Sequence, residues 1–114
     1  MKHAKTGRKF GRKSNQRKAL LRSLALSLIN HGKIKTTEAK AKELRPYIEK
    51  IITGARTNST HSRRLIRSKL GADNKNLFEK VVPMYKDRNG GYTRITKLGT
   101  RDSDGSPVAQ IEFV

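Results

Sequence analysis

The sequence of 114 residues contains no cysteine and no tryptophan, and it has three phenylalanines, three tyrosines and three prolines. The lack of cysteine excludes disulfide bonds, thiolate catalysis and cysteine-ligated zinc, and it fits a reducing compartment. A chain of this length typically forms one domain and buries roughly two-thirds of its unfolded surface. Because aromatic side chains are scarce, aliphatic side chains must fill most of the core.

Long apolar runs are also missing. Spanning a bilayer takes ~20 apolar residues, whereas the longest run here, Leu24 to Ile29, is interrupted by Ser27. The first residues lack the apolar region and small-residue cleavage site of a secretory signal. A cationic organelle transit peptide is an alternative, but Gly7 and Gly11 with a single Phe10 make a poor amphipathic helix. We therefore expect no membrane partner.

Acidic residues are few, with 9 Asp and Glu against 27 Lys and Arg, and the formal net charge is +18. Self-repulsion of this size favours association with polyanions. The first 18 residues contain no acid and eight cations: Lys2, Lys5, Arg8, Lys9, Arg12, Lys13, Arg17 and Lys18. We expect residues 1–14 to form a basic N-terminal arm and residues 15–114 a single RNA-binding domain. A solvated tail is the alternative for the arm, although Phe10 within it could stack on a base.

Four helices are predicted after the arm. The first is expected to be capped by Ser14 or Asn15, carries an apolar stripe with helical spacing and ends at Gly32, which suits a left-handed helix end. Arg17, Lys18 and Arg22 lie near its start, where the helix dipole favours anions. That placement becomes favourable if an external anion binds there.

The second helix is expected to be capped by Thr36 or Thr37, and Pro46 inside it predicts a kink or a local break near Arg45. Its apolar stripe consists of Ala41, Leu44, Ile48, Ile51, Ile52 and Ala55.

The third helix follows a cap at Ser59 or Thr60, ends at Gly71 and carries Arg63, Arg64 and Arg67. The fourth should start after a cap at Asp73, bury Leu77, Phe78, Val81, Val82 and Tyr85, and stop near Pro83.

The last third of the sequence favours strands. Residues 109–113 alternate cleanly between apolar and polar, residues 92–98 alternate less well, and residues 99–107 form a loop rich in turn residues. Residues 33–37 are a possible third strand. We expect an α+β fold with about four helices packed on a small two- or three-stranded mixed sheet that ends in a C-terminal hairpin.

No catalytic or metal site is predicted. The three histidines are isolated, and the Asp102–Gly105 segment lacks the first and last ligands of a calcium loop. The nine acids are too scattered for a magnesium cluster, and Gly90-Gly91 lacks the spacing of a nucleotide-binding loop. The glycine pair reads as a tight turn. The alternative is close approach to a phosphate beside Arg88, Tyr92 and Arg94.

Four separated strings resemble one family. "MKHAKTGRKFGRKSNQRKAL" at the start, "IKTTEAKAKELR" at 34–45, "GGYTRITKLGTR" at 90–101 and "AQIEFV" at the end resemble the bacterial family of the seventeenth protein of the large ribosomal subunit, in order and spacing. The resemblance implies a non-catalytic structural protein in the cytoplasm. It also implies contacts with large-subunit ribosomal RNA near the outlet of the nascent-chain tunnel, beside other large-subunit ribosomal proteins.

By position, the resemblance implies RNA contacts from the basic segment Lys2–Arg17 and from Lys33, Lys35, Lys40 and Arg94. The other cations are suggested by their charge, and Tyr92 is suggested by its place beside the Gly90-Gly91 turn. The full set of expected RNA contacts is Lys2, Lys5, Arg8, Lys9, Phe10, Arg12, Lys13, Arg17, Lys18, Arg22, Lys33, Lys35, Lys40, Arg63, Arg64, Arg67, Arg88, Tyr92 and Arg94. No cofactor and no small-molecule substrate are expected.

Two other functions are possible from the residues alone. The third and fourth helices, joined at Gly71, could form a helix-turn-helix of a DNA-binding protein. An enzyme such as a nuclease would require Asp102 or Asp104 to bind a metal.

Overall fold

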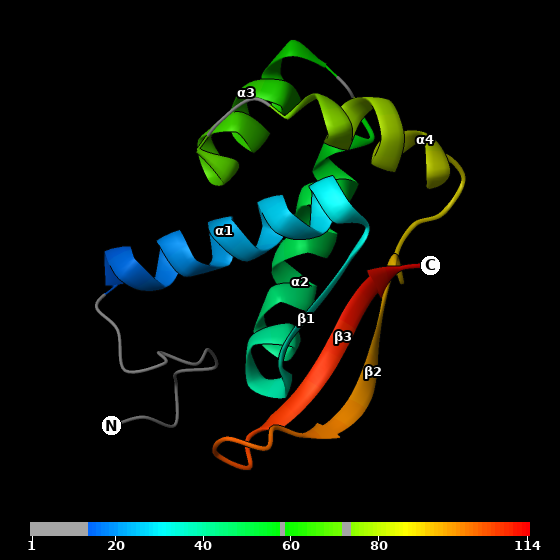
Figure 1. The fold of residues 1–114 in the computed structure, drawn as a ribbon. Helices are drawn as coiled ribbons and strands as arrows, with labels where there is room; N and C mark the ends of the chain where they lie inside the picture. The colour runs from blue at the N-terminus through cyan, green and yellow to red at the C-terminus, as the bar shows by residue number, and fades with distance from the viewer. Residues whose placement is uncertain (1–13, 58, 72–73) are drawn as a thin grey trace, which may run out of the picture.

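The computed structural model describes residues 14–57, 59–71 and 74–114 (Figure 1). Its elements follow the expected order of helices first and a hairpin last, which confirms the α+β class. They are α1 (Ser14–His31), β1 (Lys33–Thr37), α2 (Glu38–Ala55), α3 (Thr60–Leu70), the π-helical turn η1 (Leu77–Val81), α4 (Val82–Met84), β2 (Thr93–Thr100) and β3 (Pro107–Phe113).

The helix ends are set by local chemistry. The Thr37 hydroxyl accepts a hydrogen bond from the backbone of Lys40 and caps α2, and Ser59 forms a reciprocal capping box with Ser62 at the start of α3. Gly32 and Gly71 follow α1 and α3 with φ angles of 81° and 78°, in the left-handed region that favours glycine. These four predictions are confirmed.

Two details of the long helices differ from expectation. Ser14 and Asn15, the expected caps of α1, are both already helical. The local break considered near Arg45 does not occur, because α2 runs unbroken through Pro46. Pro46 lies on the exposed side of α2, so water can satisfy the carbonyl that loses its hydrogen bond there.

The fourth helix contains a π turn. The Val82 N–H donates to the carbonyl of Leu77, five residues earlier. Pro83 explains this geometry, because its ring lacks an N–H and would clash with the carbonyl four residues before it in a regular α-helix. The expected cap Asp73 lies outside the described residues. The helix ends at Met84, as the position of Pro83 predicts.

The sheet has the order β1-β3-β2, and both pairings are antiparallel. The expected mixed sheet is therefore wrong. β1 and β2 are each antiparallel to β3 and therefore run parallel to each other, but β3 lies between them, so they do not pair. β2 and β3 are also longer than expected and are joined by residues 101–106. A β-bulge at Leu98, between Lys97 and Gly99, interrupts the β2–β3 register.

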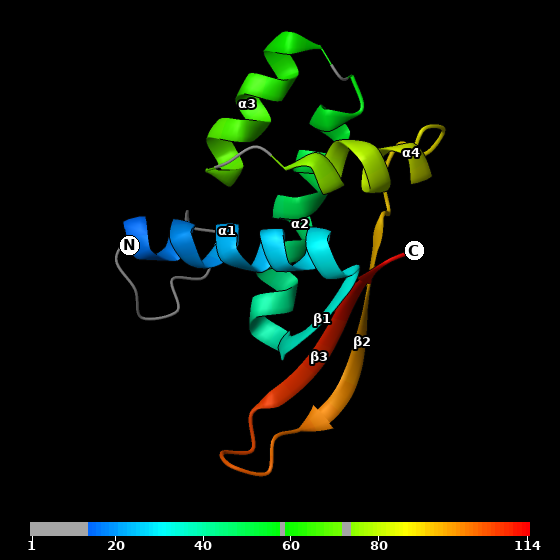
Figure 2. The same ribbon diagram turned by 45° about the horizontal axis from the view of Figure 1, so that its top comes forward.

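The core forms around α2. This helix packs against one face of the sheet, α1 crosses it, and α3 and the η1–α4 segment cover its C-terminal end (Figures 1 and 2). The apolar stripe of α2 is fully buried, as predicted. Ile111 of β3 and Leu28 of α1 join this core from either side. One helix thus holds both the sheet and the other helices in place.

Candidate nucleic-acid interface

The basic N-terminal half of α1 lies against the C-terminal end of α3. The Arg22 guanidinium donates to the carbonyls of Lys69 (Nε to O, 3.0 Å) and Ser68 (Nη2 to O, 3.4 Å). The Tyr47 hydroxyl of α2 also donates to the Lys69 carbonyl, at 2.7 Å. A cation and a hydroxyl thus satisfy carbonyls at the negative end of the α3 dipole. Arg22, predicted as an RNA contact, has this structural role in the protein.

This contact joins two groups of cations that are far apart in the sequence. α1 contributes Lys18, which is exposed, and Arg17, which is partly exposed, while α3 contributes exposed Arg64 and Arg67. Neither helix contains an acidic residue. We call the surface formed by Arg17, Lys18, Arg22, Arg63, Arg64, Arg67 and Lys69 the helical basic surface.

Arg63 of this surface is positioned by an aromatic ring. Its guanidinium carbon lies 4.7 Å from the centroid of the Phe78 ring, which η1 supplies. Such a cation–π contact orients the side chain while its charge remains accessible. Arg63 itself is exposed.

A second group of predicted contacts lies on the sheet. Register places Lys33 and Arg94 on either side of Glu112, and Lys35 opposite Gln110. Arg94 donates to the Glu112 carboxylate at 3.0 Å. Lys33, Lys35 and Arg94 are exposed, but Glu112 offsets part of their charge.

The remaining predicted contacts are dispersed. Lys40 is partly buried in the first turn of α2. Arg88 is exposed, and its guanidinium lies 5.4 Å from the Tyr85 ring centroid and donates to the carbonyls of Val114 (2.8 Å) and Gly91 (3.3 Å). The arm residues Lys2, Lys5, Arg8, Lys9, Phe10, Arg12 and Lys13 lie outside the described residues.

Tyr92 is a core residue. Its side chain is fully buried against Tyr85, with ring centroids 4.9 Å apart, and its hydroxyl lies 3.1 Å from that of Thr53 and donates to the Arg88 carbonyl at 3.2 Å. The ring is therefore not available to a base in this structure. The sequence suggested otherwise because Tyr92 directly follows the Gly90-Gly91 turn, and period-two alternation is weak in that strand.

Acidic residues have structural roles. The hydrogen bond from Arg101 to Asp104 lowers the pKa of this carboxyl from 3.8 to about 2. The hydrogen bond from Lys42 lowers the pKa of the Glu38 carboxyl. The Lys97 ammonium lies 3.6 Å from the same carboxylate. Among the residues that the structure describes, no cluster of three or more His, Asp or Glu side chains could hold a metal ion. Within the same residues, no helix is long and apolar enough to cross a membrane.

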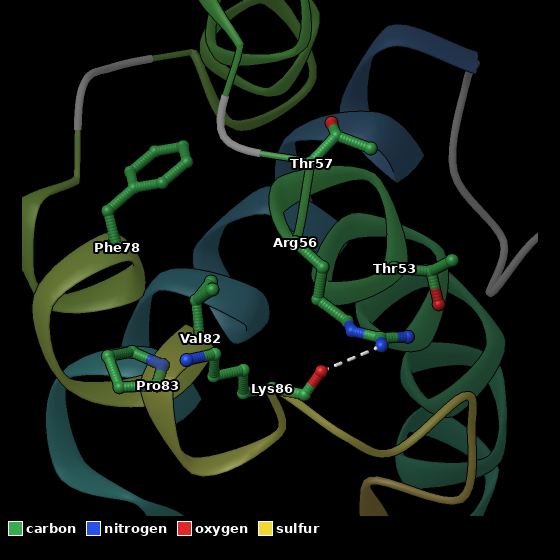
Figure 3. A pocket seen from close by; sticks show the side chains of 7 residues that line it. All are labelled: Thr53, Arg56, Thr57, Phe78, Val82, Pro83 and Lys86. Atoms are coloured by element: carbon green, nitrogen blue, oxygen red, sulfur yellow. Dashed lines mark hydrogen bonds between the residues drawn. The ribbon is translucent and has the colours of Figure 1, made fainter.

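Sequence reasoning missed Arg56 and Lys86. The two residues line a hollow of about 590 Å³ together with Phe78 and Val82 (Figure 3). They come from opposite sides of the α3 segment in the sequence, and only the fold brings them together. No local pattern could have identified them.

These features define a class of small, strongly basic α+β proteins whose cations are distributed over helices and sheet. Comparison with known proteins shows to which family of that class the chain belongs. The sequence model of the family described as Ribosomal protein L17 matches residues 20–114, and the chain belongs to this family. The family resemblance noted in the sequence is thereby confirmed.

Individual relatives match over the whole of this chain. The large ribosomal subunit protein bL17 of Gemmatimonas aurantiaca is 52% identical, over 100% of this chain and 98% of that protein. The bL17 protein of Thermomicrobium roseum is 48% identical, over 100% of this chain and 99% of that protein. The bL17 protein of Sphingopyxis alaskensis is 52% identical, over 100% of this chain and 84% of that protein.

Proposed function

We propose that this chain binds large-subunit ribosomal RNA through its basic arm and its distributed Lys and Arg side chains, near the outlet of the nascent-chain tunnel and beside other large-subunit ribosomal proteins. As a member of the L17 family, the chain is a non-catalytic structural constituent of the large ribosomal subunit. The proposed compartment is the cytoplasm, where the chain is part of the ribosome.

The observation that carries this proposal is the helical basic surface. Neither α1 nor α3 contains an acid, and the contact of Arg22 with the end of α3 brings Lys18, Arg22 and Lys69 side by side. Phosphate contacts of this kind give affinity and orientation without reading a sequence. Arg is well suited to them, because its planar fork makes paired hydrogen bonds with phosphate.

The arm has a complementary role in the proposal. Residues 1–14 would lie along the RNA and residues 15–114 would form the folded domain. Each phosphate contact releases counterions, which offsets the conformational entropy that the arm loses on binding.

Salt-dependent binding of the full-length chain to transcribed large-subunit ribosomal RNA tests the arm. Replacing Lys2, Lys5, Arg8, Lys9, Arg12 and Lys13 by Gln should flatten the plot of log affinity against log salt by about four to five units if all six contact phosphate, at ~0.7–0.9 per contact. An unchanged slope would reject the arm as an RNA contact.

A charge-matched pair tests the helical basic surface. The triple variant Arg64→Gln, Arg67→Gln and Lys69→Gln should weaken RNA binding more than the variant Lys50→Gln, Lys75→Gln and Lys80→Gln, although both lose three charges. Equal weakening would mean that net charge alone drives binding. Equal affinity of the unmodified chain for duplex DNA at matched salt would favour the helix-turn-helix alternative.

A further inference from the structure

A hollow lies at the C-terminal end of α2, and Phe78, the ring beneath Arg63, belongs to its lining. The hollow is formed where the C-terminal end of α2 faces the η1–α4 segment, and its volume is about 590 Å³ (Figure 3). That volume falls within the roughly 300–1,000 Å³ typical of small-molecule sites. Its lining consists of Thr53, Arg56, Thr57, Phe78, Val82, Pro83 and Lys86.

One wall is apolar and aromatic. Phe78, Val82 and Pro83 form it, and all three belong to the segment that the π turn reshapes. Phe78 also lines a smaller hollow beside Arg63, whose guanidinium lies over the ring. The ring is thus held by a cation and still borders the larger hollow, where a second flat group could stack on it.

Arg56 lies across from this wall and is held in place by hydrogen bonds (Figure 3). Arg56 donates to the carbonyl of Lys86 (Nη2 to O, 3.0 Å) and, at longer range, to Asn89 and the Tyr92 hydroxyl. Its Nε is buried and has no hydrogen-bond partner within the described protein. The Lys86 side chain is exposed and extends along the hollow below Val82 (Figure 3).

In the part of the chain that the structure describes, Arg56 and Lys86 are not paired with a carboxylate. The lining contains no Asp or Glu, and none of the ion pairs found among the described residues involves Arg56 or Lys86. Thr53 and Thr57 complete the lining, but their hydroxyls are already hydrogen-bonded, to the Tyr92 hydroxyl (3.1 Å) and to the Gly54 carbonyl (2.9 Å). The hollow therefore combines a stacking surface with positive charge.

This combination matches one ligand chemistry, a nucleotide with an unpaired base. The base would stack beside Phe78, and its phosphate would lie near Arg56 and Lys86. Proteins that recognise RNA by its bases bind mostly unpaired ones. An acidic peptide would use the cations but would leave the aromatic wall without a role.

We propose that the hollow between α2 and the η1–α4 segment binds one unpaired nucleotide of ribosomal RNA, with Phe78 as the stacking residue and Arg56 and Lys86 as the phosphate contacts. The inference rests on the proposed function and adds a defined site to the distributed phosphate contacts.

Nuclear magnetic resonance titration of the full-length chain tests the site without the ribosome. Adenosine 5′-monophosphate should shift the methyl signals of Thr53, Thr57 and Val82 and the ring signals of Phe78. Ribose 5-phosphate should bind at least five-fold more weakly, because one base–aromatic stack contributes ~1–3 kcal/mol, which corresponds to about five- to 150-fold in affinity. Equal shifts with ribose 5-phosphate would mean an anion site and would overturn the proposal.

Variants separate the two halves of the site. Phe78→Leu should weaken nucleotide binding at least five-fold and Phe78→Tyr should retain it. Lys86→Gln should weaken binding while the control Lys80→Gln, which removes the same charge from the same segment, should not. Equal effects of Lys86→Gln and Lys80→Gln would contradict a phosphate contact at Lys86. These two positions are exposed, so this pair remains informative if Phe78→Leu fails to fold.

The site and the proposed function can fail separately. If the chain binds large-subunit ribosomal RNA but adenosine 5′-monophosphate leaves the hollow unchanged, the nucleotide site is wrong and RNA binding stands. If RNA binding itself is absent at ordinary salt, the proposed function is wrong. Shifts at the hollow with an acidic peptide instead of the nucleotide would assign it to a protein partner and overturn the inference.

Discussion

The helical basic surface and the sheet carry their positive charge differently. In and beside the sheet, Arg94 contacts Glu112, Lys97 contacts Glu38, and the hairpin-loop residue Arg101 contacts Asp104. In α1 and α3, Arg22 donates to backbone carbonyls and Arg63 lies over the Phe78 ring.

The difference follows from where the acids lie in the sequence. A carbonyl or a ring orients a guanidinium without cancelling its charge, whereas a carboxylate removes one unit of net charge. The ion-paired cations Arg94, Lys97 and Arg101 thus contribute part of their charge to local structure. α1 and α3 themselves contain no acid, and a group of cations of this kind can attract a polyanion.

Both regions pack against α2, so a substitution that removes its core contacts should destabilise both of them. Ile51→Ala deletes a fully buried side chain and should cost about 2–5 kcal/mol of unfolding free energy. That is a large share of the ~5–15 kcal/mol typical of a domain. Urea denaturation measures it, with Leu65→Ala as the control at a side chain that is 51% exposed. Equal losses from the two substitutions would contradict the assignment of the core.

A smaller change should affect the helical basic surface alone. Arg22→Gln removes the donors to the Ser68 and Lys69 carbonyls and should cost about 1 kcal/mol, since these bonds are partly exposed. Hydrogen exchange should quicken in the last turn of α3 and remain unchanged in β3. Unaltered exchange in α3 would show that Arg22 does not hold the two helices together.

On the sheet, the interaction between Arg94 and Glu112 should be weaker and should depend on salt. A double-mutant cycle with Arg94→Gln and Glu112→Gln should give an interaction energy of about 0.2–1 kcal/mol, as for other exposed ion pairs. The coupling should decrease in 1 M salt, where screening is strong. A coupling that salt leaves unchanged would mean that charge is not what joins these side chains.

The smallest expected effect is the pH dependence of stability that Asp104 in the hairpin loop contributes. The Asp104 pKa of about 2 lies below its ordinary value of 3.8, so the carboxylate stabilises the folded state above pH 3.8. This stabilisation is lost as pH falls from there through about 2. Carboxyl resonances followed by pH titration measure this pKa, and Arg101→Gln should raise it towards 3.8. An unchanged pKa in that variant would contradict Arg101 as the main cause.

Local chemistry made much of the fold predictable. Gly32 and Gly71 marked helix ends because only a residue without Cβ adopts their backbone angles easily. The cap Ser59 was recognisable from its type and position, and the alternation at Ala109 and Ile111 identified the inner face of β3.

Features that depend on distant residues were not predictable. Pro83 indicated where the fourth helix stops but not the π turn before it, and the central place of β3 depends on pairing across the whole chain. For the candidate interface, the sequence identified the cations of α1 and α3 separately. The contact of Arg22 with α3, the burial of Tyr92 and the pairing of Arg56 with Lys86 all required the fold.

The outer strands of the sheet have a consequence for the protein before assembly. β1 and β2 flank β3 and expose their outer edges within the described structure (Figure 1). β1 has only five residues and two exposed lysines, Lys33 and Lys35, while the bulge at Leu98 disturbs β2. Short, charged and irregular edges are poor templates for a strand of another molecule. Pairing of one copy's sheet with that of another copy is therefore disfavoured.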